Sequence, residues 1–543
     1  MAGLSASASS ASASASKSSQ SGAQPGARGM SKAKSAAALT ALILGAGVAN
    51  MNLSVANVGL PDIGKDLQAS QVGLNLVAVG FSLGLSISVL YLGALGDRFG
   101  RKGMLLLGLI LGIPAAFMSF FSSSIEVLAI SRLLGGVAAG MAYPTTLALI
   151  TAIWAGSRRT TAIALWSALG AGLSALSPLI AGALLMVTKW NWMFLVAVPF
   201  AVVAIVLVIL NVPSKLNETT EPVDHWGGVF SAIFFGGLVL TINFIALDGH
   251  LMTVIWMALV TILGGFAFFW RQARTRFPLF DLTFARRPTF WVAAVSGIIV
   301  FGSLMGAMYI GQQFLQNVLG YDPLMAGAAI LPCVVAMIAV APLSSRLTES
   351  HGSRVTLLIG FALCFAGFSS MLLLWGLDTS YVWVAVSYGL IGLGVGIAGT
   401  PASHALTNSV PVTKVGMASG TGDLQRDLGG AIMQSILGAL LGAGYARSIA
   451  ADIAAEPTAV QQQISQDTAT ALAKSFGSAS DLASRYPDYA KAIIAAAKQS
   501  FLDGANWAYL VGIIAMILGA ALVWFLFPRR NRERELYQQF GTD

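Results

Sequence analysis

The sequence predicts an all-α polytopic membrane protein, and three observations carry this prediction. Of its 543 residues, 56% are hydrophobic and only 10% are charged, whereas charged residues make up about a quarter of a soluble domain. Long apolar runs recur along the chain, each close to the roughly 20 residues that a helix needs to cross a bilayer. Basic residues fall mostly in alternate connections between these runs. A soluble fold is therefore excluded.

Residues 1–34 precede the first apolar run and have a different composition. Most of this segment is a Ser/Ala/Gly tract without an apolar core, which is typical neither of a signal peptide nor of a span. We expect a disordered tail, because nothing in it offsets the entropy lost on ordering. Met30 is a second candidate for the true start, which N-terminal sequencing would decide.

Fourteen apolar runs are long enough to be membrane-spanning helices. An even number of spans places both termini on the same side of the membrane. The first six expected spans lie near residues 36–60, 72–94, 103–122, 126–152, 158–186 and 191–212. The other eight lie near residues 226–247, 251–270, 289–316, 323–344, 354–376, 380–406, 414–443 and 506–528.

The positions of Lys and Arg orient these spans. Twenty-two of these residues lie in the termini or in the connections assigned to the inner side, and only Lys65 and Lys189 lie in the short outer loops. The positive-inside rule predicts this bias, so both termini are expected in the cytoplasm of a bacterial inner membrane. The net charge of +8 therefore indicates orientation and not a nucleic-acid partner.

The segment 444–505 is a long outer loop, and long loops are exempt from the charge rule. Two sets of apolar residues in it recur at helical spacing and predict two short amphipathic helices on the outer surface. Two roles stay open, a solvated cap without a role of its own and a lid or docking surface for an envelope partner. The two sets are Val460, Ile464, Leu472 and Phe476, and Tyr489, Ile493, Ala497 and Phe501.

The stretch Gly93–Gly103 joins the second and third expected spans. Its three cations and its acid cannot lie in hydrocarbon, so it must sit at a membrane surface. The stretch resembles the signature loop of the major facilitator superfamily, and Ser345–Arg354 is a weaker copy where a duplicated second half requires one. The residues that carry the resemblance are Gly93, Asp97, Arg98, Gly100, Arg101 and Lys102.

Further motifs at 54–61, 132–140, 177–182 and 190–194 resemble the fourteen-helix drug:proton antiporter branch of that superfamily. The resemblance implies the major facilitator fold and a secondary exporter of amphipathic or hydrophobic small molecules, driven by proton antiport. It divides the chain into an N-terminal six-helix bundle (35–213), two inserted helices with a basic cytoplasmic linker (214–284), a C-terminal six-helix bundle that includes the outer loop (285–530) and a cytoplasmic tail (531–543).

The resemblance also implies roles for charged residues. Asp97 would cap the N-terminus of the thirteenth span and hold the cytoplasmic side closed. Arg132 would be a fixed positive charge that disfavours protonation of a nearby acid; snorkelling or a structural pair is the alternative. Ionisable groups inside a span need such reasons, because each costs about 3 kcal/mol or more. At Asn52 the sequence departs from the branch, whose helix-1 motif carries an acid there.

The thirteenth span contains Asp423, Arg426 and Asp427. Their spacing places all three on one helix face, where Arg426 can pair with either carboxylate. Two acids that share one arginine leave a net negative charge that a proton could neutralise, so they are the candidates for proton coupling. The alternative is a salt bridge of an intracellular gate, because the cluster lies near Lys414.

Polar and aromatic residues within the spans predict the lining of a substrate cavity. Most are uncharged, which argues against a small, highly charged substrate. For any one of them, packing or hydrogen bonding between helices is the alternative. The candidates are Asn50, Asn52, Ser54, Asn57, Tyr143, Trp166, Tyr309, Gln312, Gln313, Gln316 and Tyr388.

Several function classes are not indicated. The sequence lacks a P-loop, a metal-ligand spacing of histidines and a nucleophile elbow, so we expect neither an enzyme nor a cofactor or metal site. A proton gradient would supply the energy, and the expected partners are the lipid bilayer and a small amphipathic substrate, with the chain as a monomer. Two alternatives stay open: an exporter of a lipid or endogenous metabolite, and a non-transporting receptor or scaffold.

Overall fold

A computed structural model of the chain describes residues 31–154, 156–214, 222–245, 251–411, 415–457 and 465–542. Over these ranges the chain forms helices and turns, without a β-strand. Thirteen of the described helices are long and apolar enough to cross a membrane, and α5 (Gly156–Leu185) is a further helix of 30 residues. The expected all-α, fourteen-helix membrane fold is therefore confirmed.

Six long helices make up the first half of the chain. Polar caps start several of them, because an N-terminal serine side chain can accept a hydrogen bond from an otherwise unpaired backbone N–H. Ser31, Ser70 and Ser124 each do so with the N–H three residues further on. The helices are α1 (Lys32–Asp66), α2 (Gln71–Phe99), α3 (Arg101–Phe120), α4 (Ile125–Ile153), α5, the 3-10 turn η1 (Trp190–Leu195) and α6 (Ala197–Asn211).

Two helices, α7 (His225–Phe244) and α8 (Leu251–Arg274), separate this half from the second one. α7 packs against α8, α2 and α15. The second half consists of α9 (Leu282–Ala285), α10 (Pro288–Gln313), the π-helical turn η2 (Phe314–Val318), α11 (Pro323–Ala328), α12 (Leu331–His351), α13 (Ser353–Leu374), α14 (Tyr381–Asn408), α15 (Val415–Ala455), α17 (Gln466–Lys474), α18 (Phe476–Arg485), η4 (Pro487–Tyr489), α19 (Ala490–Leu526) and α20 (Arg530–Thr542).

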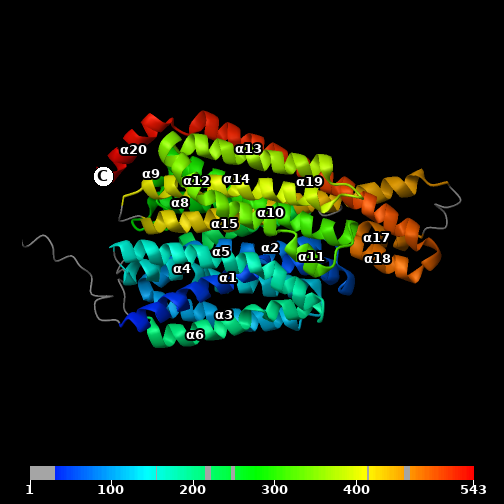
Figure 1. The fold of residues 1–543 in the computed structure, drawn as a ribbon, viewed down its shortest axis with the longest axis horizontal. Helices are drawn as coiled ribbons and strands as arrows, with labels where there is room; N and C mark the ends of the chain where they lie inside the picture. The colour runs from blue at the N-terminus through cyan, green and yellow to red at the C-terminus, as the bar shows by residue number, and fades with distance from the viewer. Residues whose placement is uncertain are drawn as a thin grey trace, which may run out of the picture.

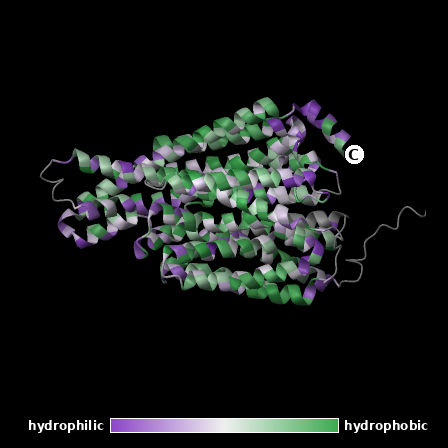
Figure 2. Ribbon diagram, turned by 180° about the vertical axis from the view of Figure 1, so that it is seen from behind, coloured by the Kyte–Doolittle hydropathy of each residue, from purple (hydrophilic) through white to green (hydrophobic). Residues whose placement is uncertain are grey.

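The two halves lie side by side as two layers of nearly parallel helices (Figure 1). Hydrophobic residues cover most of the length of these helices, and hydrophilic residues gather toward their ends and on α17 and α18 (Figure 2). We call the end with α17 and α18 the cap end. The opposite end, which holds α20 and the α2–α3 and α12–α13 turns, is the loop end.

The α2–α3 turn and the α12–α13 turn use the same backbone device. Gly100 has φ 115° and Gly352 has φ 86°, a region that glycine adopts more easily than residues with a Cβ. Each glycine is the single residue between two long helices. The echo of the signature loop at 345–354 thus has a matching geometry, and the surface turn is shorter than the predicted Gly93–Gly103 because both of its flanks are helical.

The segment 444–505 is only in part a separate loop. α15 continues to Ala455 and α19 begins at Ala490, so both spans extend beyond the expected membrane. The predicted second surface helix, Tyr489–Phe501, is wrong, because the helical period there runs without a break into the last span and forms the first turns of α19. Val460 and Ile464, in the first predicted set, lie outside the described residues.

The short helices α17 and α18 connect the two halves at the cap end. α18 packs against α19 of its own half and against α1 of the other half. The Ser475 hydroxyl donates to the Ala69 carbonyl over 2.9 Å, and the Gln68 amide donates to Asp481 over 3.3 Å. The cap is therefore attached to the α1–α2 turn as well as to its own half.

Candidate functional site

Amide side chains join the two halves near the cap end. Gln71 of α2 donates from Nε2 to the Tyr309 hydroxyl over 3.1 Å and to Gln313 Oε1 over 3.0 Å. Gln316 donates to the Val58 carbonyl of α1 over 2.7 Å. Three predicted cavity residues, Tyr309, Gln313 and Gln316, thus form hydrogen bonds across the interface between the halves.

Direct backbone contact between α5 and α11 reinforces this closure. A Cβ atom on Gly182 would lie 2.4 Å from the Pro323 carbonyl oxygen, and one on Gly327 would lie 2.5 Å from the Pro178 carbonyl oxygen. Only glycine permits so close an approach at both places. With the amide bonds, this contact closes the cap end between the two halves.

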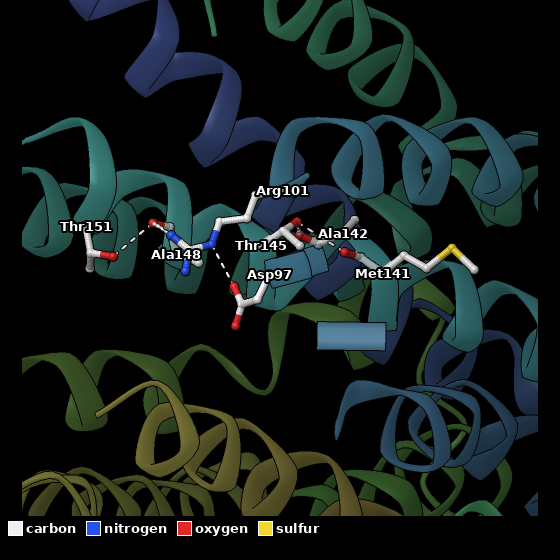
Figure 3. A network of polar contacts seen from close by, with 7 residues as sticks. All are labelled: Asp97, Arg101, Met141, Ala142, Thr145, Ala148 and Thr151. Atoms are coloured by element: carbon white, nitrogen blue, oxygen red, sulfur yellow. Dashed lines mark hydrogen bonds and ion pairs between the residues drawn. The ribbon is translucent and has the colours of Figure 1, made fainter. Parts of the chain in front are cut away.

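The charged residues at the α2–α3 turn bind within the first half (Figure 3). Arg101 Nε lies 2.7 Å from Asp97 Oδ1, and Arg101 Nη1 donates to the Ala148 carbonyl of α4 over 3.4 Å. Lys102 Nζ donates to the Val212 carbonyl, just beyond α6, over 2.6 Å. These bonds fix the turn to α4 and to the end of α6.

The expected contact between Asp97 and the thirteenth span is absent in this conformation. Among the described residues, Asp97 pairs with Arg101 and makes no hydrogen bond to α15. A Cβ atom on Gly93, or on Gly420 or Gly422 of α15, would meet no atom within 4 Å. Among the described residues, these three glycines therefore leave room for closer packing at the loop end.

A buried charged cluster lies where α15 approaches α4. Asp423 and Asp427 are almost fully buried, and Asp427 Oδ2 has no hydrogen-bond partner among the described residues. The described part of the chain shows no ion pair between Arg426 and either carboxylate. Instead, Arg426 Nη1 donates to the Tyr143 hydroxyl of the first half over 2.8 Å, and its guanidinium lies 5.5 Å from the Phe301 ring centroid.

Trp166 of α5 extends this cluster with a second aromatic ring. Its ring centroid lies 5.7 Å from that of Tyr143, and its Nε1 donates to the Thr146 hydroxyl over 3.0 Å. The structure therefore assembles five of the predicted site residues from three helices, two in the first half and one in the second. We call them the acid–aromatic cluster: Tyr143, Trp166, Asp423, Arg426 and Asp427.

Other predicted cavity residues lie elsewhere. Tyr388 is buried within the second half, with its ring centroid 5.8 Å from that of Trp375, and Gln312 donates to the Ala326 carbonyl over 2.9 Å. Asn57 is buried, and within the described part of the chain neither of its side-chain polar atoms has a hydrogen-bond partner. Asn50 is half-buried, and the side chain of Ser54 lies outside the described residues.

Arg132 lies inside the first half, where it is 2% exposed. Its Nη2 donates to the main-chain carbonyl of Asn52 over 2.6 Å. Its guanidinium lies 4.9 Å from the Phe81 ring centroid and 5.6 Å from that of Phe194. No carboxylate among the described residues forms an ion pair with it.

The prediction missed a polar junction between α2, α7 and α15. Asn75 donates to Asn243 Oδ1 over 2.5 Å, and Asn243 donates to the Ser435 hydroxyl over 2.6 Å. All three side chains are buried. The sequence could have indicated this junction, because Asn75 and Asn243 lie inside apolar runs, where asparagines tend to form hydrogen bonds between helices.

Comparisons with known proteins identify the family of the chain and several similar proteins. The family model described as Major Facilitator Superfamily matches residues 42–433. The multidrug resistance protein Stp of Mycobacterium tuberculosis is 28% identical over 487 residues, which are 88% of this chain and 89% of that protein. The multidrug efflux pump LfrA of Mycolicibacterium smegmatis is 30% identical over 473 residues, 87% of this chain and 92% of that protein.

The fold is also similar to that of solved transporters. A bacterial homolog of the human lysosomal transporter Spinster, in an inward-facing and unoccupied conformation, superposes with a TM-score of 0.61. The match covers 94% of this chain and 99% of that chain at 15% sequence identity. This likeness concerns the fold alone.

Proposed function

Because the chain belongs to the major facilitator superfamily, we propose that it is a secondary active exporter of amphipathic or hydrophobic small molecules, driven by proton antiport. One observation carries this proposal: two buried carboxylates lie beside aromatic residues where the two halves meet. The names of Stp and LfrA as multidrug resistance and efflux proteins support the class of substrate.

We take the closed cap end, with room beside Gly93, Gly420 and Gly422 at the loop end, as one state of an alternating-access cycle. The loop end faces the cytoplasm in our proposal, as the excess of Lys and Arg in its connections supports. The conformation is then inward-facing, with 35–213 and 285–530 as the two moving bundles and 214–284 inserted between them. In the outward-facing state Asp97 would reach the N-terminus of α15, where the helix dipole favours a carboxylate.

The acid–aromatic cluster can couple substrate to protons by competition. Asp423 and Asp427 are almost fully buried, and a charge there is costly unless it is paired. A proton on either carboxyl removes that charge, and a bound amphipathic cation offsets it. The proton and the bound cation therefore exclude each other, and antiport requires this competition. Tyr143 and Trp166 supply faces on which an apolar or cationic ligand can stack.

The environment of the protein follows from the same proposal. We place the chain as a monomer in the cytoplasmic membrane of a bacterium, with both termini inside. Residues 444–505, including α17 and α18, would then lie outside the membrane, where they offer a surface for an envelope partner. The bacterial origin of the relatives Stp and LfrA supports this location.

Proton release from energised inverted vesicles tests this function. When ethidium, an amphipathic cation, is added, the wild-type chain should release protons that a pH-sensitive dye reports. Asp427→Asn should abolish the signal, and Asp467→Asn, on the exposed face of α17, should retain it. Absence of proton release together with export of a labelled lysolipid would contradict drug antiport and favour the lipid exporter.

A further inference from the structure

A cavity of about 40 Å³ lies inside the first half, between α1, α3, α4 and α6. No residue of the acid–aromatic cluster lines it, so it is distinct from the proposed transport site. Its walls are mainly small and apolar residues of these four helices. The polar residues that line it are Asn52, Ser119, Ser131 and Arg132, and no carboxylate is among the lining residues.

Arg132 is the charge in this cavity, and its donors are largely unused. A guanidinium carries five N–H donors, yet among the described residues only Nη2 has a hydrogen-bond partner, the Asn52 carbonyl. Nε is buried and has no partner in that part of the chain. A buried charge without a counterion is strongly destabilising. Two aromatic rings also lie beside the guanidinium, but the described residues supply no anion, so an anion in the cavity would be the counterion of Arg132.

The two serines in the cavity do not supply this counterion. The Ser119 hydroxyl lies 2.7 Å from that of Ser131 and can donate to it, and the Ser131 hydroxyl donates to the Leu128 carbonyl over 2.7 Å. They are neutral and already paired. An anion that enters the cavity would thus take its main contact from Arg132.

The cavity borders α3 and α6, whose lining residues Gly112, Ile113, Ala116 and Val198 are half-buried. These two helices form the outer edge of the first half (Figure 1). Gly112 lines the cavity, and a Cβ atom on it would meet no atom within 4 Å. Leu111 and Phe117 of α3 and Val202 of α6 are exposed, as expected of helices that face lipid. The half-buried lining residues on α3 and α6 thus give a ligand a route from the bilayer.

We propose that this cavity binds the head of a single-chain anionic amphiphile, with a carboxylate against Arg132 and a hydrocarbon tail that leaves between α3 and α6. The volume of about 40 Å³ exceeds the roughly 10–15 Å³ that one water requires on the same measure. The cavity therefore has room for a head of carboxylate size. The apolar walls and the route from the bilayer favour an amphiphile over a free inorganic anion.

Photolabelling of the full chain in nanodiscs of zwitterionic lipid tests the proposal without any transport assay. The probe is a palmitic acid with a diazirine in its chain, and labelled residues are mapped by mass spectrometry. Label should fall on α3 and α6. Palmitate should compete, whereas hexadecanol, which lacks the charge, and sodium chloride should not.

Two variants remove the site in different ways. Arg132→Gln removes the charge, and Gly112→Leu obstructs the route from the bilayer while Arg132 is retained. Arg132→Gln should weaken labelling about tenfold or more, the ratio expected for the loss of one charge-assisted hydrogen bond. Gly112→Leu should weaken it by blocking entry of the probe. Arg274→Gln, at the exposed end of α8, should label as the wild type does. If Arg132→Gln does not fold, Gly112→Leu decides alone.

Three results would overturn the proposal. Equal labelling of Gly112→Leu and wild type would show that the cavity is not the binding site. Equal competition by hexadecanol and palmitate would show that the charge is not recognised. Competition by chloride as strong as that by palmitate would reduce the site to one for a small anion. Because the readout is binding, each result is independent of whether the protein exports drugs.

Discussion

Tyr143 and Arg426 connect the two halves through a single hydrogen bond of 2.8 Å. This bond would hold the Arg426 guanidinium in place beside the two carboxylates. Tyr143→Phe should then weaken binding of ethidium about tenfold, since a hydrogen bond to a charged group contributes about 1.5–3 kcal/mol. The measurement is ethidium affinity by fluorescence titration of the purified protein.

A matched control separates this effect from the loss of any tyrosine hydroxyl. Tyr509 is also buried, and its hydroxyl has no hydrogen-bond partner in the residues that the structure describes. Tyr509→Phe should therefore leave the affinity unchanged. Equal affinities of Tyr143→Phe and wild type would show that the bond does not shape the site.

At this scale the sequence predicted the chemistry of the site better than its contacts. The spacing of Asp423, Arg426 and Asp427 places them on one turn of one helix, which is a local property. The partner of Arg426 is a tyrosine far away in sequence, and its identity depends on how two helices are rotated against each other. For the same reason, Tyr309 and Gln313 resembled cavity residues but bond to Gln71 across the closed cap end.

α20 is an element whose role only the structure reveals. Its Glu533 is 4% exposed and accepts a hydrogen bond from the Ser353 N–H, at the first residue of α13, over 3.1 Å. A carboxylate there satisfies a free N–H and complements the helix dipole. Arg530 adds a bond of 3.2 Å to the Glu349 carbonyl at the end of α12. α20 thus fastens the α12–α13 turn.

Glu533→Gln should therefore lower the stability of the protein by about 1 kcal/mol, as the loss of a helix cap does. Glu535→Gln is the matched control, because Glu535 is exposed and pairs only with the exposed Arg532 among the described residues. Thermal unfolding in detergent should show a lower midpoint for the first variant and no change for the second. Equal midpoints would mean that α20 does not support α13.

Element boundaries were harder to predict than the elements themselves. Apolar runs identified every span, because the hydrocarbon thickness fixes their length. The ends of α15 and α19 are set instead by contacts beyond the membrane, where apolar periodicity continues without marking the surface. A single glycine of positive φ, Gly100, sets the break between α2 and α3. The charged residues around it led to the prediction of a longer turn, Gly93–Gly103.

At the scale of the whole molecule, transport requires the cap end to open. Gln68 of the first half and Asp481 of α18 face each other across that end. A cysteine at each position, joined by a cleavable bis-maleimide, should hold the cap end closed. Ethidium export should then fall to the background of empty vesicles and return when the linker is cleaved.

Each single-cysteine variant with the same reagent is the control for this experiment, and both should export normally. The native Cys333 and Cys364 are buried and need not be replaced. Full export by the cross-linked protein would show that the cap end does not separate during the cycle.

The fold as a whole was predictable because composition, span length and charge bias all report the membrane. The sequence could not predict which end is closed, because the charge rule applies equally to the inward-facing and outward-facing conformations. The contacts of Gln71, Gly182 and Gly327 decide it here. Likewise, the cavity beside Arg132 has no signature in sequence spacing, because it forms where four helices diverge.

The central claim is that Asp423 and Asp427 couple export to the proton gradient, and the most direct test compares uphill with downhill transport in proteoliposomes. The wild-type protein should concentrate ethidium against its gradient when a proton gradient is imposed. The double variant Asp423→Asn, Asp427→Asn should lose this uphill transport and keep downhill exchange of ethidium. Undiminished uphill transport by the double variant would contradict the claim.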